Sequence, residues 1–280
     1  MKRFLIIGGD SRQDYLQQYL ENDGFPVMRY RGHEQAQPSL ADAMEQANVI
    51  LSPLPFTKNG TELFSAAEGE ALPILAFLSC LKKGHILFGG NIPDQVKSRC
   101  RTEDIPVYDF MKMEDVALKN TVATAEGAIA EAIVLSPGAL HHSSCLITGY
   151  GRCGETLARK LTALDVRVTA ADRSKARLAL AYSQGLRCMH LGTPFPFCSF
   201  SLSSFDVIFN TIPSLVLDDS ALRTAKKDAV LLDLASAPGG IDLTACKKRG
   251  LRAKSCPGLP GLYCPKAAAK ILYQAVTEHL

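Results

Sequence analysis

The stretch Ser144-Cys145-Leu146-Ile147-Thr148-Gly149-Tyr150-Gly151-Arg152-Cys153-Gly154 decides the fold of this chain. It begins with a short apolar run that predicts a buried β-strand over residues 144–148, and its three glycines fit the pattern Gly-x-Gly-x-x-Gly. A helical segment and a second strand follow, and Asp172 stands about 20 residues beyond the loop. Three glycines can also serve only to join a strand tightly to a helix, but this full context predicts a dinucleotide-binding unit.

Each glycine has its own task in such a loop. Gly149 permits the tight turn after the strand, Gly151 lets the backbone approach a diphosphate, and Gly154 lets the helix pack closely on the strand. The diphosphate then lies at the positive end of the following helix. We therefore predict that this loop holds a nicotinamide dinucleotide, and its other members are Tyr150, Arg152 and Cys153.

The residues after the second strand leave two cofactors open. Asp172 is placed to accept hydrogen bonds from the ribose hydroxyls of NAD and to repel the 2′-phosphate of NADP. The neighbouring Arg173, Ser174 and Arg177 are instead suited to bind that phosphate. The pattern predicts NADP or NAD without choosing between them.

Two further turns follow predicted strands of the same half and should meet the glycine loop at the carboxyl edge of one sheet, where open sheets bind ligands. They can also be ordinary turns rich in Pro and Gly. We predict that they line the nicotinamide side, through Asn210, Thr211, Ile212, Pro213, Ala235 and Ser236.

Apolar runs alternate with longer amphipathic segments along the entire chain of 280 residues, a pattern typical of parallel strands joined by helical crossovers. We therefore predict an α/β protein. The expected strands cover residues 4–7, 26–30, 48–52, 85–88 and 107–110 in the first half, and residues 144–148, 167–171, 207–210, 230–233 and 251–254 in the second.

Small and aliphatic residues recur at helical spacing from Asn120 until Pro137-Gly138 stops the pattern. This segment predicts a long linker helix between two Rossmann-like, doubly wound parallel-sheet domains. The expected division is a substrate domain at residues 1–119, the linker at 120–138, an NAD(P)-binding domain at 139–264 and a C-terminal helix at 265–280 that can pack back on the first domain.

The composition argues against several other classes of protein. The net charge is only +3 and the basic residues are scattered, so nucleic-acid binding is not expected. No apolar run is long enough to cross a bilayer, and the apolar stretch near the N-terminus is too short for a signal peptide. The nine cysteines never form Cys-x-x-Cys, and no cluster has metal-ligand spacing. We expect a cytoplasmic protein with reduced thiols and no metal.

The chain also resembles a known family, the A subunit of dipicolinate synthase from spore-forming bacteria. The resemblance covers nearly the whole length, and its motifs are specific through their order and spacing. They are the opening residues 7–13, Pro53-Leu54-Pro55-Phe56 to Gly60, residues 120–129, the loop Gly149 to Gly154, and residues 258–266.

This resemblance implies an NAD(P)-linked dehydrogenation during sporulation that yields pyridine-2,6-dicarboxylate from a dihydro or hydroxytetrahydro precursor. It also implies a small heterocyclic dicarboxylate as substrate and, as partner, a flavoprotein-like B subunit, and we expect a homo-oligomer as well. The family pattern has a small residue before Arg at the end of the second strand of the nucleotide domain, which suits NADP. Asp172 departs from that pattern, whereas Arg173 keeps it.

A substrate with two carboxylates needs donors at both ends, and we expect them in a cleft between the domains. Arg12 starts a helix after the first strand, and Thr57, with Lys58 and Asn59, follows a later strand of that domain. Glu126 is an acid in a small and apolar helix, which suits a desolvated proton acceptor or a solvent-facing residue near the helix start. The remaining candidates are Asn120, Thr124 and Lys266.

Two alternatives stay open. The chain can be another two-domain NAD(P) dehydrogenase of a small hydroxy or amino acid, although the residues from Pro257 to Lys266 contain no His that would serve such a reaction. It can also be a nucleotide-binding subunit without chemistry of its own that supports a catalytic partner.

Overall fold

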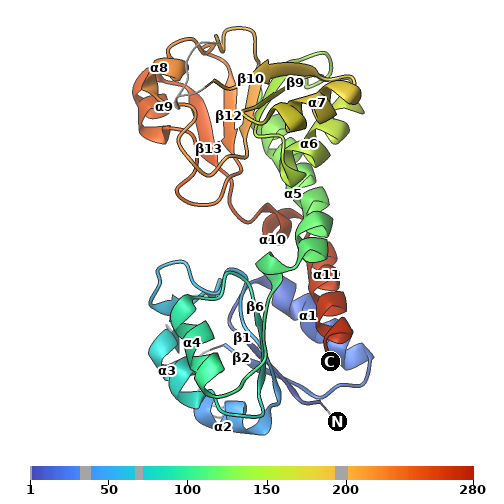
Figure 1. The fold of residues 1–280 in the computed structure, drawn as a ribbon, viewed down its shortest axis with the longest axis vertical. Coiled ribbons are helices and arrows are strands. Elements are labelled where there is room, and N and C mark those ends of the chain that lie inside the picture. Colours follow the sequence, from blue (N-terminus) through green and yellow to red (C-terminus); the bar gives the residue numbers. More distant parts are fainter. Residues whose placement is uncertain (1, 32–38, 67–71, 193–200) are drawn as a thin grey trace. The chain divides into compact units, whose positions relative to one another are not determined.

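The structure is a computed structural model that describes residues 2–31, 39–66, 72–192 and 201–280. The chain forms two compact units (Figure 1). The first unit comprises Met1–Asn120 together with Cys264–Leu280, and the second comprises Thr121–Tyr263.

The first unit is built on a parallel five-stranded sheet with the order β2-β1-β3-β6-β7. In sequence order this is 2-1-3-4-5, the arrangement of flavodoxin-like sheets, whose ligands bind where the strand order reverses, beside β1. Its strands are β1 (Phe4–Ile7), β2 (Val27–Tyr30), β3 (Val49–Leu51), β6 (Ile86–Gly89) and β7 (Val107–Asp109), and a separate antiparallel pair is formed by β4 (Glu62–Leu63) and β5 (Leu72–Pro73).

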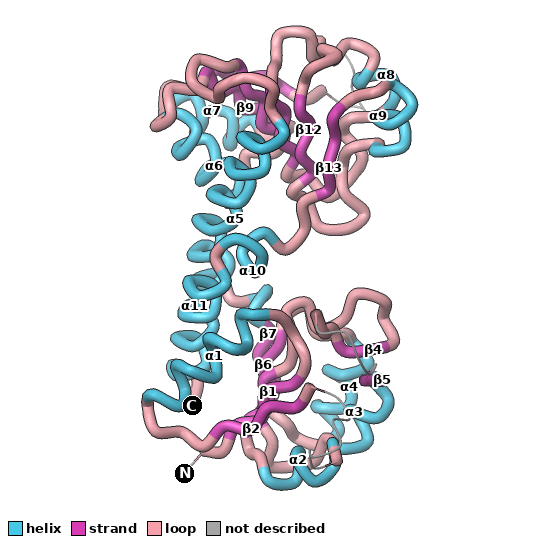
Figure 2. The backbone as a smooth tube through the Cα atoms, turned by 180° about the vertical axis from the view of Figure 1, so that it is seen from behind, coloured by secondary structure: helices cyan, strands magenta, loops and turns pink. Residues whose placement is uncertain are grey.

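Alternate residues of β1 separate the two faces of this sheet. Leu5 and Ile7 pack in one apolar core, whereas Phe4 and Ile6 pack in a second core with residues of the C-terminal helix. Figures 1 and 2 both show this helix beside the first helix of the chain. One face therefore carries α2 (Leu40–Gln46), α3 (Ile74–Cys80) and α4 (Asp94–Thr102), and the other carries α1 (Ser11–Asn22) and α11 (Pro265–Glu278).

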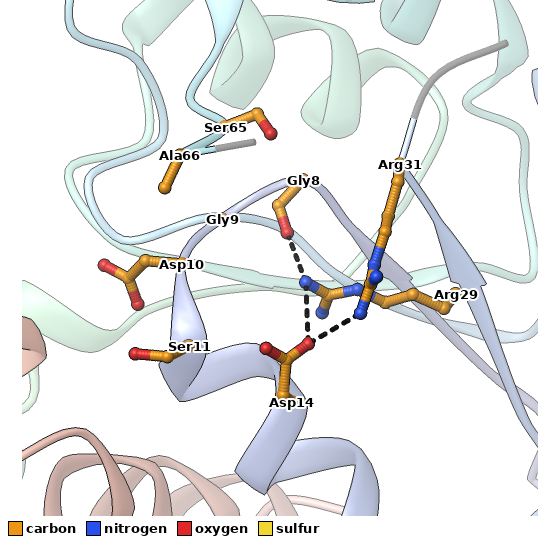
Figure 3. A pocket seen from close by; sticks show the side chains of 9 residues that line it. All are labelled: Gly8, Gly9, Asp10, Ser11, Asp14, Arg29, Arg31, Ser65 and Ala66. Atoms are coloured by element: carbon orange, nitrogen blue, oxygen red, sulfur yellow. Dashed lines mark hydrogen bonds and ion pairs between the residues drawn. The ribbon is translucent and has the colours of Figure 1, made fainter. Parts of the chain in front are cut away.

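The turn from β1 into α1 contains Gly8 and Gly9, both with positive φ angles of 54° and 86° (Figure 3). Asp10 caps the helix and forms a capping box with Gln13. A short 3-10 helix, η1 (Phe110–Lys112), follows β7 and precedes the long helix α5 (Glu114–Leu135).

His85 is a buried polar residue of this unit, and its side chain is 2% exposed. Its Nδ1 accepts from the backbone N–H of Lys82 at 3.3 Å, and its Nε2 lies 3.0 Å from the carbonyl of Met44. This pattern suits the neutral ring, and burial lowers the pKa of His85 below its usual 6.5.

We expect the stability of the protein to fall as the pH drops below about 6.5, because the unfolded state then binds a proton that folded His85 binds only at lower pH. The contribution is complete above the unfolded pKa. His85→Gln should flatten the loss of unfolding free energy between pH 7.5 and pH 5.5 in urea titrations. His141→Gln, at an exposed position, serves as the control, and an unchanged pH profile in His85→Gln would contradict the assignment.

The second unit contains a parallel six-stranded sheet with the order β10-β9-β8-β11-β12-β13. In sequence order this is 3-2-1-4-5-6, the arrangement of dinucleotide-binding Rossmann sheets. The strands are β8 (Ser144–Thr148), β9 (Arg167–Asp172), β10 (Arg187–His190), β11 (Val207–Asn210), β12 (Val230–Asp233) and β13 (Arg252–Ser255).

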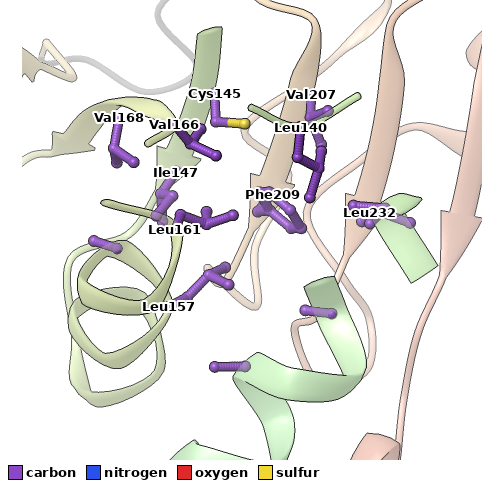
Figure 4. Packing of buried hydrophobic residues seen from close by; sticks show 14 of the residues in the cluster. Leu140, Cys145, Ile147, Leu157, Leu161, Val166, Val168, Val207, Phe209 and Leu232 are labelled. Carbon is purple, nitrogen blue, oxygen red and sulfur yellow. The ribbon is translucent and has the colours of Figure 1, made fainter. Parts of the chain in front are cut away.

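Helices cover both faces of this sheet. Cys145 and Ile147 of β8 pack with Leu157 and other residues of the helices on one face (Figure 4), whereas Leu146 points into a second core. The first face carries α5, α6 (Arg152–Thr162), α7 (Lys175–Ser183) and α10 (Leu259–Tyr263), and the second carries α8 (Asp219–Leu222) and α9 (Leu243–Arg249).

The predicted fold class is confirmed, because both large sheets are parallel and carry helices on both faces. Some boundaries differ from the prediction. The long helix begins at Glu114 and ends at Leu135 rather than covering 120–138, and α6 begins inside the glycine loop, at Arg152. β10 was not predicted, because its residues are mostly exposed at the sheet edge and so form no apolar run.

Candidate functional site

The glycine loop joins β8 to α6 at the position where the strand order of the second sheet reverses. Gly149 has a φ angle of 92°, and a Cβ atom there would lie 2.3 Å from Oγ1 of Thr211. A Cβ atom on Gly154 would lie 2.0 Å from the carbonyl oxygen of Gly149. Both positions therefore require glycine for the turn and for the close packing that the pattern predicts.

Gly151 differs from the other two glycines of the loop because the space around it is open. The nearest atom to a Cβ placed there is Nη1 of Arg177, at 3.8 Å. Gly151 is the N-cap of α6, and no side chain caps that end of the helix. The first turn of α6 thus keeps the positive end and the backbone donors that bind diphosphates in such folds.

The corresponding turn of the first unit is closed. A Cβ atom on Gly9 would lie 2.3 Å from Cδ of Gln13, because the Gln13 side chain folds back to accept a hydrogen bond from the backbone N–H of Asp10 at 3.0 Å. Asp10 in turn caps α1. Of these two turns, only the one at Gly151 leaves open the space beside the glycine through which a diphosphate would approach.

Asp172 ends β9 and is 3% exposed. Its Oδ2 accepts from the backbone N–H of Tyr150 at 2.8 Å, and its Oδ1 accepts from that of Ser174 at 2.8 Å. The guanidinium of Arg177 lies 3.5 Å from the same carboxylate. Asp172 therefore holds the glycine loop in place, and its oxygens are already occupied.

The cationic candidates lie beside this acid. Arg173 is exposed, and Ser174 caps α7 by accepting from the backbone N–H of Arg177 at 3.4 Å. The Arg177 side chain is 57% exposed while it contacts Asp172. The structure thus brings the candidates Asp172, Arg173, Ser174 and Arg177 together next to the loop.

Two side chains of the loop, those of Tyr150 and Cys153, are largely withdrawn into the protein. Tyr150 is 2% exposed, its hydroxyl donates to Gln184, and burial raises its pKa to about 12. Burial also raises the pKa of the Cys153 thiol, which makes it a poor nucleophile. These two residues contribute backbone and packing, whereas Arg152 is exposed at the first turn of α6.

Polar side chains end three adjacent strands and form one buried network. Asn210 of β11 pairs in register with Thr148 of β8 and Asp233 of β12. Its Oδ1 accepts from the Thr148 hydroxyl at 2.8 Å and its Nδ2 donates to Asp233 at 2.8 Å. Asp233 also accepts from the backbone N–H groups of Ala235, Gly240 and Ile241 at 3.2, 2.8 and 3.0 Å.

This network corrects one prediction. Asn210 is 0% exposed and its amide is engaged within the protein, so its side chain positions the turn that follows instead of presenting a polar group to a ligand. Sequence reasoning missed Thr148 and Asp233, although a polar residue at the end of each adjacent strand was the available signal. The Thr211 hydroxyl donates toward the carbonyls of Thr148 and Gly149 at 3.1 and 3.0 Å, so it too supports the loop.

The remaining candidates on these two turns differ in their exposure to solvent. Ile212 is half-buried and Pro213 is exposed after β11. Ala235 is buried, whereas Ser236 beside it is exposed. Pro213 and Ser236 are therefore the members of this group that present surface at the carboxyl edge.

The expected proton acceptor is corrected as well. Glu126 is exposed on α5 and its carboxylate lies 2.9 Å from Nζ of Lys160, so it forms a surface ion pair and is not desolvated. The buried acid of this helix is Glu131, whose carboxylate is held by Lys254 at 2.7 Å. Hydrogen bonds from Lys254 and Tyr263 lower the pKa of Glu131, which suits a structural ion pair.

Arg12 of the first unit is also engaged within the protein. It is 5% exposed, its guanidinium donates to both oxygens of Asp10 at 2.9 and 2.8 Å, and it also donates to the carbonyl of Leu54. Thr57 closes a turn, because its hydroxyl accepts from the backbone N–H of Gly60 at 2.9 Å. Both side chains thus have partners within the first unit, and a role of either toward a substrate anion stays a prediction.

The other substrate candidates are distributed over the two units. Asn120 and Thr124 are half-buried on α5, with Asn120 in the first unit and Thr124 in the second. Lys266 is exposed at the start of α11. Within the described ranges, no group of His, Cys, Asp and Glu residues is arranged to hold a metal ion. None of the helices in that part of the chain combines the length and the apolar character that a membrane span requires.

Comparison with known proteins agrees with the resemblance. Residues 3–111 match the family described as the N-terminal domain of the A subunit of dipicolinate synthase. The A subunit of dipicolinate synthase from Bacillus subtilis (strain 168) is 29% identical over 99% of this chain and 95% of its own length. The crystal structure of the corresponding A subunit from Bacillus halodurans is 27% identical and superposes with a TM-score of 0.84, covering 99% of this chain and 97% of that one.

Residues 3–111 thus match this family, and the whole chain is similar to A subunits of dipicolinate synthase. Its fold is shared more widely. The D-lactate dehydrogenase of Salmonella superposes with a TM-score of 0.67 over 99% of this chain and 95% of its own at 15% identity, a likeness of fold alone. In this chain, the open turn at Gly151 is the candidate cofactor site.

Proposed function

We propose that this chain is the nucleotide-binding subunit of a dipicolinate synthase that uses NADP to oxidise a dihydro or hydroxytetrahydro precursor to pyridine-2,6-dicarboxylate during sporulation. The observation that carries the proposal is the open, uncapped start of α6 at Gly151, next to the exposed cations Arg173 and Arg177. Similarity to the A subunit of dipicolinate synthase over 99% of the chain supports the substrate class.

The surroundings of Asp172 favour NADP over NAD. An acid that selects NAD must offer its carboxylate to the ribose hydroxyls. The Asp172 side chain is 4% exposed and its oxygens accept from backbone groups of the loop. It is therefore poorly placed to accept hydrogen bonds from ribose hydroxyls. Arg177 offsets its charge, and Arg173 adds a further cation for a 2′-phosphate.

The chemistry asks for positioning more than for a strong base. When bound, the dinucleotide supplies a hydride acceptor at the nicotinamide ring. The dihydropyridine loses one hydrogen with both electrons and a second as a proton to water, and the hydroxytetrahydro precursor loses water in addition. Aromaticity of the product supplies driving force, so the chain must bind and orient the reactants. The Asn210–Asp233 network keeps the two turns beside the glycine loop in fixed positions for that task.

The proposal is tested by following the absorbance of reduced nicotinamide with the purified chain. The chain is incubated with NADP or NAD and the precursor, alone and with a flavoprotein-like B subunit. We expect turnover with NADP. Turnover that appears only with the partner would assign the activity to the complex and support the platform alternative for this chain, and no turnover in any arm would contradict the proposed reaction.

Arg173→Ala should weaken NADP binding by roughly tenfold or more, since a charge-assisted hydrogen bond to a phosphate contributes about 1.5–3 kcal/mol. NAD, which lacks the 2′-phosphate, should bind about as before. Calorimetric titration of both dinucleotides measures the difference.

Arg187→Ala provides the matched control for this prediction. Arg187 is likewise an exposed arginine of the second unit, but it starts β10 and so lies at the amino edge of the sheet. Equal losses for NADP and NAD in Arg173→Ala would contradict the phosphate role.

A further inference from the structure

A pocket of about 230 Å³ lies in the first unit, at the carboxyl ends of β1 and β2 (Figure 3). The Gly8-Gly9 turn forms one wall and Ser11 at the start of α1 forms another. The side chains of Arg29 in β2 and Arg31 just after it converge near Asp14. All residues that line this pocket belong to the first unit, and Arg29 and Arg31 are not among the predicted site residues.

Arg29 carries donors that no described residue of the chain accepts from. Its side chain is 13% exposed, and one of its terminal nitrogens donates to the carbonyl of Gly8 at 2.9 Å. Its Nε and Nη1 are buried and have no hydrogen-bond partner among the residues that the structure describes. Burial lowers the pKa of Arg29 to about 10, so the group remains a cation at neutral pH. Leaving charged donors buried and unpaired is costly, so a bound anion that accepts from Arg29 would stabilise this site.

The charges around the pocket favour an anion. Asp10 is bound by Arg12, and the contacts with Arg12 lower the pKa of Asp10 although burial opposes them. Asp14 lies 3.6 Å from Arg29 and 2.9 Å from Arg31, so a single carboxylate serves two guanidinium groups. Arg12, which does not line the pocket, neutralises Asp10, so the two lining arginines Arg29 and Arg31 share the single acid Asp14. The positive end of α1 adds to this excess of positive charge.

The size of the anion is limited by Gln13. Its side chain lies against Gly9 and caps the Asp10 amide, so the diphosphate of a dinucleotide cannot approach this turn as it can at Gly151. Arg31 has a side chain that is 48% exposed, which leaves it able to turn toward a ligand. The pocket is therefore suited to one small oxyanion.

We infer that this pocket binds a carboxylate of a small organic acid through Arg29 and Arg31. If the proposed function holds, the acid is the dicarboxylate substrate or its product, and one of its carboxylates is held in the first unit. Inorganic phosphate shares the same chemistry and is the alternative source of the anion.

The test is calorimetric titration of the full chain without dinucleotide, at constant ionic strength, with pyridine-2,6-dicarboxylate in one arm and inorganic phosphate in the other. The wild-type chain should bind the dicarboxylate, and Arg31→Ala should weaken that binding about tenfold. Asp14→Asn should strengthen it, because it removes the carboxylate that competes for both guanidinium groups. Arg3→Ala, an exposed arginine at the amino edge of the same sheet, should leave it unchanged.

Three outcomes would overturn the inference. They are an absence of dicarboxylate binding by the wild-type chain, equal effects of Arg31→Ala and Arg3→Ala, and Arg31-dependent binding of phosphate without binding of the dicarboxylate. Because no dinucleotide is present, these outcomes leave the NADP proposal standing, and failure of NADP to bind at Gly151 leaves this inference standing.

Discussion

Gly151→Ala is expected to weaken dinucleotide binding on the order of 100-fold while leaving the stability of the second unit unchanged. A Cβ atom at this position meets nothing closer than Arg177 at 3.8 Å, so the folded chain accommodates it. The same methyl group occupies the space through which a diphosphate reaches the first amides of α6. Loss of several charge-assisted hydrogen bonds, each contributing about 1.5–3 kcal/mol, accounts for an effect of this size.

The measurement pairs calorimetric titration of NADP with urea unfolding of the same variant. Gly138→Ala is the matched control, since Gly138 lies in the same unit, has open space around its Cα and also has no positive φ. The control should match the wild-type chain in both measurements. Normal NADP binding by Gly151→Ala would show that the diphosphate does not lie on this turn, and the proposed cofactor site would be wrong.

The sequence was sufficient for the sheets because buried parallel strands are continuous apolar runs. Phe4–Ile7 and Ser144–Thr148 are such runs, and both occur in the structure with the predicted bounds. Arg187–His190 is not a continuous apolar run, because an edge strand needs no such run to pair with its neighbour. Buried strands were therefore more predictable than strands at the edge of a sheet.

The side chains of the candidate site were less predictable because their partners come from distant parts of the sequence. Glu126 reads as a desolvated acid among small residues, yet Lys160 of another helix neutralises it. Arg12 reads as an anion ligand, yet the carbonyl of Leu54 and its own neighbour Asp10 occupy it. The glycine loop was predictable because its requirements are set by the local backbone, as the contacts of Gly149 and Gly154 show.

The same reasoning explains why Asp172 was ambiguous. Its position at the end of the second strand is the position that selects NAD in many nucleotide domains. Its contacts with Tyr150 and Ser174 turn it inward, toward the loop, and only the folded chain reveals this. An acid at this position of the motif therefore does not by itself predict the cofactor, because its effect depends on whether the carboxylate faces the ligand or the protein.

Asp233→Ala is expected to lower the unfolding free energy of the protein by about 3 kcal/mol or more, since a buried donor left without its acceptor costs about 1–3 kcal/mol. Asp233 is 3% exposed, and its carboxylate accepts from Asn210 and from the backbone groups of Ala235, Gly240 and Ile241. All four donors lose their acceptor at once.

Urea unfolding of Asp233→Ala measures this loss, and Asp228→Ala is the control because Asp228 is an exposed acid of the same unit. The control should change the unfolding free energy by less than about 0.5 kcal/mol. Because Asn210 links Asp233 to Thr148 at the start of the glycine loop, NADP binding by the folded Asp233→Ala variant should weaken too. Equal stability losses in the two variants would mean that the network does not hold the carboxyl edge together, and the two turns would then need another reason to keep their places beside the cofactor loop.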